Sequence, residues 1–216
     1  HNDAESAAGD VLLFTFDDAT TKDFSGGAIA AVIGEGYDGD YDVEGGNPGG
    51  TRANDINLGL DNKDRFGSEL SLDYDSTLNR HRLAVLSRDD HGLDNPNGTG
   101  NAAQEGAVYL FTFTDDAFSG GSHVGTIGRN YDTTASDFDF QLTTTEGWGG
   151  AMTSVALEGN YLAVGAARTN VNVKNDGQAE LFSFTNNTAA TQFNNIVSEG
   201  TLCSTGCTDT EDINVV

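Results

Sequence analysis

The stretch GAVYLFTFTDD at residues 106–116 recurs in the chain in recognisable form. The other copies are GDVLLFTFDD at residues 9–18 and GQAELFSFT at residues 177–185. The sequence FSGG follows the copies that begin at Gly9 and Gly106, at residues 24–27 and 118–121. Self-similarity of this extent indicates that the chain is built from repeated supersecondary units.

A second block separates these copies. FGSELSLD at residues 66–73 leads to LAV at 83–85, and WGGAMTSVAL at 148–157 leads to LAV at 162–164. We therefore expect one repeat domain over residues 1–216, with units at about 9–105 and 106–176, a partial unit at 177–200 and a tail at 201–216. The first unit is longer because of an insertion, largely residues 41–62.

The Phe-rich strands have two apolar faces. Leu12, Phe14 and Phe16 alternate with Val11 and Leu13, so we expect both faces to be covered. The Leu-Ala-Val segments are predicted to be equally buried. Each unit is interpreted as about four short strands that form a small sheet and stack on neighbouring sheets. The expected fold is all-β and repeat-built, either β-propeller-like or a stacked antiparallel sheet or sandwich.

The composition supports strands joined by turns and excludes some functions. The chain has 28 Gly and only 2 Pro, and its net charge is −24. So acidic a surface repels nucleic acid and attracts cations. No segment approaches the roughly 20 apolar residues that a membrane span needs. Hydrolytic motifs such as Gly-x-Ser-x-Gly do not occur, so we do not expect an enzyme.

The order Phe-Gly-x-x-(Ser/Thr)-(Leu/Val), Leu-Ala-Val and Gly-Ala-Val-Tyr-Leu-Phe resembles the FG-GAP type of β-propeller repeat. It is more closely similar to repeats of large bacterial exoproteins of the filamentous-haemagglutinin kind. The resemblance covers roughly residues 9–200, and it implies an extracellular, propeller-like protein with an adhesive or structural role. In this chain Leu-Ala-Val-Leu-Ser replaces the family's Leu-Ala-Val-Gly-Ala in the first unit, and neither unit has a clean copy of the family's calcium loop.

Two full units are too few for a closed propeller, which needs about four blades. Two interpretations remain open. The chain is a fragment of a larger secreted adhesin, or it is a subunit that neighbouring strands complete in a self-assembling extracellular fibre. The alternative function is a lectin-like carbohydrate-binding module, which would need exposed aromatic side chains on a groove. The expected partners are further copies of the chain or a cell-surface glycan.

Several residues are candidate sites. Alternating carboxylates suit calcium, although they also suit a solvated acidic loop; they are Asp38, Asp40, Asp42 and Glu44. The weaker metal candidates are the pairs Asp73 with Asp75 and Asp89 with Asp90, while Asp137 and Asp139, which flank Phe138, also fit the polar face of a strand. Cys203 and Cys207 are expected to form a local disulfide of an oxidising compartment. The glycosylation acceptors are Asn97 and Asn186.

Overall fold

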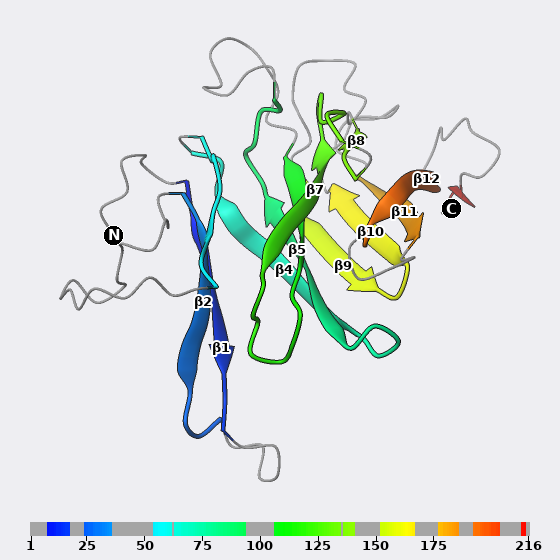
Figure 1. Cartoon of the computed structure of the whole chain (residues 1–216). Helices are drawn as coiled ribbons and strands as arrows, with labels where there is room; N and C mark the ends of the chain where they lie inside the picture. Colours follow the sequence, from blue (N-terminus) through cyan, green and yellow to red (C-terminus); the bar gives the residue numbers. More distant parts are fainter. Residues whose placement is uncertain are drawn as a thin grey trace.

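The computed structural model describes residues 8–17, 24–35, 54–61, 63–93, 106–134, 136–140, 152–166, 177–185, 192–203 and 213–214. Every regular element in these residues is a β-strand, and the strands form three sheets (Figure 1). The all-β fold class predicted from the sequence is therefore confirmed. The described residues contain no helix that could span a membrane.

The three sheets follow one another along the chain. The first sheet contains β1 (Asp10–Thr15), β2 (Ala28–Gly34) and β3 (Ile56–Asn57). The central sheet contains β4 (Phe66–Asp75), β5 (Arg80–Ser87), β6 (Ala107–Thr112), β7 (Ser122–Gly128) and β8 (Phe138–Asp139). The last sheet contains β9 (Ser154–Glu158), β10 (Tyr161–Ala166), β11 (Gln178–Thr185), β12 (Asn194–Cys203) and β13 (Ile213–Asn214).

The central and last sheets share one topology. Four strands pair antiparallel in chain order, and a short fifth strand pairs parallel to the fourth. The first sheet contains the equivalents of the third, fourth and fifth strands, since β1 pairs antiparallel with β2 and β3 pairs parallel to β2. Each large sheet starts at or just after the Phe-Gly block, so the sheets are offset along the chain from the units read in the sequence.

Equivalent turns have equivalent geometry. Phe24, Phe118 and Phe193 all adopt positive φ, at 57°, 57° and 54°. This left-handed conformation is unusual for a bulky residue, so its recurrence shows that the same turn precedes β2, β7 and β12. Asn195, with φ of 51°, occupies the position held by Gly120 in the central sheet. The last turn is thus a third copy of the FSGG turn, which its sequence does not reveal.

The carboxylates that hold the short fifth strand also recur. Asp55 accepts a hydrogen bond from the backbone N of Val32 at 2.8 Å. Asp137 accepts the equivalent bond from the backbone N of Thr126, also at 2.8 Å. A backbone N–H that no neighbouring strand pairs needs another hydrogen-bond acceptor. These two aspartates supply that acceptor, so their role is structural.

Two apolar cores separate the three sheets. Val11, Leu13 and Ile33 of the first sheet pack with Leu83 and Phe111 of the central sheet. A second core lies between the central and last sheets, where Leu86 and Leu110 contact residues such as Leu162, Val164 and Phe182. The sheets therefore form a row in which the central sheet is covered on both faces (Figure 1).

Burial of the Phe-rich strands differs along the row. All six residues of β6 are buried, as predicted, and Leu83, Ala84 and Val85 are buried as well. The prediction that both faces are covered is wrong for β1, because Phe14 and Phe16 are 47% and 45% exposed. No described sheet lies against that face of β1.

Candidate functional site

A pair of phenylalanine rings recurs at one position in all three sheets. The pairs are Phe16 with Phe24, Phe113 with Phe118, and Phe184 with Phe193, with ring centroids 5.1, 5.2 and 4.7 Å apart. One ring comes from the end of the Phe-rich strand and the other from the turn before the next strand. The repeat sequence thus determines the pair locally, whatever surrounds it.

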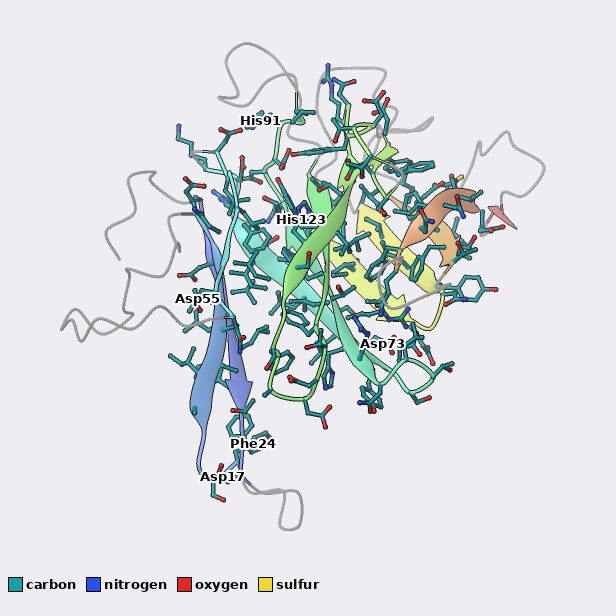
Figure 2. The ribbon with its side chains drawn as sticks, viewed as in Figure 1. Asp17, Phe24, Asp55, Asp73, His91 and His123 are labelled. Carbon is teal, nitrogen blue, oxygen red and sulfur yellow. The ribbon has the colours of Figure 1, made fainter. Side chains whose placement is uncertain are left out.

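The surroundings of the three pairs differ. Phe113 and Phe193 are fully buried, and Phe118 and Phe184 are no more than 7% exposed. By contrast, Phe16 is 45% exposed and Phe24 is 75% exposed. Figure 2 shows Phe24 at the tip of the first sheet, away from the other sheets. The equivalent phenylalanine pair is therefore buried in the core at two sheets and exposed on the surface at the first sheet.

This exposed pair belongs to a larger surface. We define the head face as the outward side of the first sheet, made by Leu12, Phe14, Phe16 and Phe24. Leu12, Phe14 and Phe16 align with Tyr109, Phe111 and Phe113 of the central sheet, which lie in the core against the first sheet. The residues of the head face thus occupy repeat positions that, in the central sheet, are covered by a neighbouring sheet.

The opposite end of the row has a matching surface. We define the tail face as the outward side of the last sheet, made by Tyr161, Ala179, Leu181, Val197 and Leu202. Strand register places Ser183 between Tyr161 and Val197, and Ala179 beside Leu202. Tyr161, Val197 and Leu202 are 56%, 51% and 38% exposed. This face, uncovered by described residues, is apolar except for Ser183, which donates a hydrogen bond to the exposed Glu199.

The tail face repeats a surface that is buried elsewhere in the chain. Leu202 pairs with Ala179 as Ile127 pairs with Val108 and as Ile33 pairs with Val11. Ile127 and Ile33 are fully buried between sheets. Head and tail faces therefore correspond to the two sides of the interfaces that already exist inside the molecule.

A buried ion pair ties the central sheet to the last one. Arg82 is 1% exposed, and its guanidinium pairs with Asp73. The guanidinium carbon lies 5.8 Å from the ring centroids of both Phe184 and Phe193, within the range of cation–π attraction. Among the described residues the Nε and Nη1 atoms of Arg82 have no hydrogen-bond partner, so the aromatic faces and Asp73 together offset the buried charge.

A cleft of about 770 Å³ opens beside this ion pair. It lies between the turn joining β4 to β5 and the turn joining β9 to β10, and its lining includes Tyr74, Glu158 and Tyr161. Tyr74 and Tyr161 are 45% and 56% exposed. The cleft thus combines carboxylates, hydroxyls and two accessible aromatic rings. Figure 2 shows Asp73 at this end of the central sheet.

A cluster of acidic and phenolic groups lies at the other end of the strands. The Tyr109 hydroxyl donates to Oδ2 of Asp90 at 2.8 Å, and the Tyr131 hydroxyl donates to the same atom at 3.2 Å. Burial raises the pKa of Asp90, although these bonds and one from the backbone N of Gly92 act in the opposite direction. The same burial raises the pKa of Tyr109.

Asp64 belongs to this cluster. Burial, together with the charge of Asp90 and then of Asp61 and Asp89, raises the pKa of Asp64 to about 7. Its Oδ2 accepts a hydrogen bond from the backbone N of Asp61 at 2.7 Å. A carboxyl group with this pKa exchanges a proton near neutral pH, which makes the cluster a pH-sensitive part of the fold.

The weaker metal candidates from the sequence have partners within the chain. Asp75 accepts bonds from the backbone N atoms of Thr77 and Leu78, while Asp73 pairs with Arg82. Asp89 pairs with Arg65 at 3.0 Å.

The third candidate pair likewise holds the backbone, since Asp139 accepts a bond from the backbone N of Asn130 at 2.6 Å and Asp137 from that of Thr126. The described residues contain no group of three or more His, Cys, Asp or Glu side chains arranged to hold a metal.

The other predicted site residues lie largely outside the described part of the chain. These are Asp38, Asp40, Asp42 and Glu44 of the calcium candidate, Cys207, and the glycosylation acceptors Asn97 and Asn186. Cys203 ends β12 and is 3% exposed. Its pairing with Cys207 stays a prediction.

Sequence reasoning missed two of the features above. Arg82 is the third residue of β5, directly before the apolar run Leu83–Leu86, and that position was the available signal. Asp64 follows the insertion, where acidic residues are too common in this chain to single one out. No family model, no curated protein and no solved structure matches the chain. The resemblance to FG-GAP repeats therefore rests on the sequence motifs alone.

Proposed function

We propose that this chain is a building block of an extracellular repeat assembly, in which copies stack head face to tail face. The observation that carries the proposal is the exposed Phe16–Phe24 pair, because its two equivalents are buried between sheets. Stacking would place the Phe rings of one copy against Leu181 and Leu202 of the next. It would continue the row of sheets as propeller-like blades or as an open stack.

Energetics favour such contact. Fully burying one large apolar side chain contributes roughly 1.5–3 kcal/mol, and the head face presents three phenylalanines. Two different faces that meet form a heterologous contact, which gives rings or open filaments rather than closed dimers. A structural or adhesive role at a cell surface fits these properties, and calcium bound by the acidic segment of residues 38–44 would be an added stabiliser.

The negative charge of each copy opposes the association, so salt concentration can be used to change its strength. The net charge of −24 makes copies repel one another. Salt screens this repulsion over a Debye length of about 10 Å at 0.1 M, and it strengthens apolar contacts. Self-association through the two faces should therefore increase with sodium chloride concentration.

The test is the molar mass of the protein by light scattering after size-exclusion chromatography, at increasing protein and salt concentration. We expect the wild type to form oligomers and Phe14→Glu to remain monomeric. Leu93→Glu is the matched control, because Leu93 is 50% exposed but lies on neither face. A wild type that stays monomeric at high concentration and high salt would overturn the proposal.

A second candidate function is carbohydrate binding in the cleft between the two hairpin turns. Tyr74 and Tyr161 are the exposed aromatic residues that the lectin-like alternative needs, and flanking carboxylates can accept bonds from sugar hydroxyls. A glycan array with the monomeric Phe14→Glu variant tests it. Binding that Tyr74→Ala abolishes supports this function, and an array without signal contradicts it.

A further inference from the structure

Within the described residues, the edge of the first sheet formed by β1 pairs with no further strand. In the central sheet β6 pairs with β7 on one side and with β5 on the other, and in the last sheet β11 pairs with both β12 and β10. Their equivalent, β1, pairs only with β2 among the described strands. The start of this edge lies against the beginning of β4: Gly9 forms an isolated bridge with Phe66, the backbone N of Phe66 donates to the carbonyl of Ala8 at 2.8 Å, and Gly67 lies close to the carbonyl of Asp10. An unpaired strand edge readily accepts another strand.

A separate observation concerns the surface beside that edge. Leu70, Leu72 and Tyr74 of β4 are 49%, 50% and 45% exposed. Leu72 pairs with Leu83, and Leu70 pairs with Val85. Leu83 and Val85 lie in the core against the first sheet. The exposed residues of β4 therefore lie on the side of the central sheet that faces the first sheet. The described strands of the first sheet do not extend far enough to cover them.

The next interface along the row shows what covers this position. Leu157 of β9 pairs with Leu162, so it is the repeat equivalent of Leu72. Leu157 is only 6% exposed, and its backbone N donates to Oγ of Ser71 on β4 at 2.8 Å. The residue is covered because β4 and β5 of the preceding sheet lie against β9. The first sheet has no described equivalents of β4 and β5.

From the open edge of β1 and the uncovered residues of β4 we propose an acceptor site for a β-hairpin of the Leu-Ala-Val type, supplied by another polypeptide with the same repeat. One strand of the hairpin pairs antiparallel with β1, as β10 pairs with β11. The other strand lies over Leu70, Leu72 and Tyr74. The edge of β1 and the uncovered residues of β4 thus border a single site that is wide enough for two strands.

The chemistry of the incoming hairpin follows from the β9–β10 hairpin of this chain. Its side toward β4 carries the small residues Ala156 and Ala163, with Tyr161 on the same side next to the turn. Its other side carries Leu and Val and continues the apolar head face. Main-chain hydrogen bonds to β1 supply affinity, and the alternation of side chains supplies specificity.

This site is distinct from head-to-tail stacking. A second copy that stacks through its tail face keeps its own β4–β5 and β9–β10 hairpins inside its sheets, so it leaves the acceptor site empty. The two proposals can therefore fail independently. The experiment uses the Leu202→Lys variant, in which the tail face is disrupted.

The probe is a fluorescent peptide of residues 154–165, closed by a D-Pro-Gly turn because an isolated hairpin is only marginally stable in water. Fluorescence anisotropy measures its affinity, and hydrogen exchange maps where it binds. We expect saturable binding and slower amide exchange in Asp10–Thr15. A further Leu72→Asp substitution should weaken binding at least 10-fold, whereas Leu93→Asp should leave it unchanged.

Both substituted side chains are about half exposed, so neither variant should unfold, and circular dichroism checks this. Leu70→Asp is the second variant of the same surface. A control peptide with Asp at positions 156 and 163 should not bind. The proposal is overturned by absence of saturable binding, by protection elsewhere than β1, or by Leu72→Asp and Leu70→Asp variants that bind the peptide as tightly as the Leu202→Lys parent.

Discussion

Phe16 and Phe24 pack edge to face, with ring centroids 5.1 Å apart and an interplanar angle of 78°, on the open face of the first sheet. Phe113 and Phe118 repeat this geometry at 5.2 Å and 87° inside the molecule. One local arrangement therefore occurs in two environments. The difference lies in whether another sheet covers the rings, and that contrast underlies the stacking proposal.

The three turn phenylalanines form a matched set for stability measurements. Phe193→Ala should lower the free energy of unfolding by about 3–5 kcal/mol, because the ring is fully buried. Phe24→Ala should lower it by less than about 1 kcal/mol in a monomer, because Phe24 is 75% exposed.

All three turn residues have nearly the same positive φ, so backbone strain cancels in the comparison. Urea unfolding at low protein concentration, in the Leu202→Lys background, gives the values. Equal losses for Phe24→Ala and Phe193→Ala would contradict the assignment of Phe24 to the surface of the monomer.

The ion pair of Arg82 with Asp73 should respond asymmetrically to substitution. Asp73→Ala leaves a buried guanidinium without its carboxylate, which should cost about 3–5 kcal/mol of unfolding free energy. Arg82→Met replaces the charge with an apolar side chain of similar length and should cost far less. Chemical denaturation of both variants checks the order. A larger loss for Arg82→Met would mean that the ion pair stabilises the fold more than its burial costs.

The raised pKa of Asp64 predicts how stability changes with pH. The folded state holds a proton on Asp64 up to about pH 7, whereas the unfolded chain releases it near pH 4. Between these values the folded state binds more protons, so the contribution of Asp64 to stability falls as pH rises. Asp64→Asn should remove this slope.

The measurement is the free energy of unfolding of wild type and Asp64→Asn from pH 4 to pH 8. Asp75→Asn is a control, because Asp75 ends β4 and accepts hydrogen bonds from the backbone N atoms of Thr77 and Leu78 in the turn that follows, away from the Asp64 cluster. The assignment is wrong if the difference between wild type and Asp64→Asn stays constant over this range.

The alternating acidic segment predicts a response to calcium. Bound calcium stabilises the folded state in proportion to RT ln(1 + [L]/Kd), about 2.7 kcal/mol at 100 times Kd. Calcium should raise Tm and a chelator should reverse the rise, while the double variant Asp40→Asn, Asp42→Asn should show no rise. An identical rise in that variant would place any calcium effect elsewhere in the chain.

Much of the fold was predictable because the repeat contains it. The Phe-rich strand, the Leu-Ala-Val strand and the FSGG turn each recur in the sequence, and each forms the expected strand or turn. The third turn escaped prediction because only its Phe193 matches the motif, while Asn194, Asn195 and Ile196 stand in place of Ser-Gly-Gly. Sequence periodicity also could not tell Phe14 from Phe111, since the two have the same neighbours in the strand and differ only in what lies across the sheet.

The candidate surfaces were predictable only in part. Apolar faces on both sides of each Phe-rich strand indicated that sheets stack, but not which sheet ends the row. Which sheet ends the row is determined by packing between residues that are far apart in the sequence. The open edge of β1 likewise depends on which strands pair, which local propensity does not determine.

Association of the head face of one copy with the tail face of another underlies the proposed assembly. Mixing two variants that are each expected to be monomeric, Phe14→Glu and Leu202→Lys, tests it most directly by analytical ultracentrifugation. Phe14→Glu keeps an intact tail and Leu202→Lys keeps an intact head, so the mixture contains one complete interface. We expect a heterodimer in the mixture and monomers in each separate sample. Monomers in the mixture, or dimers of Leu202→Lys alone, would contradict it.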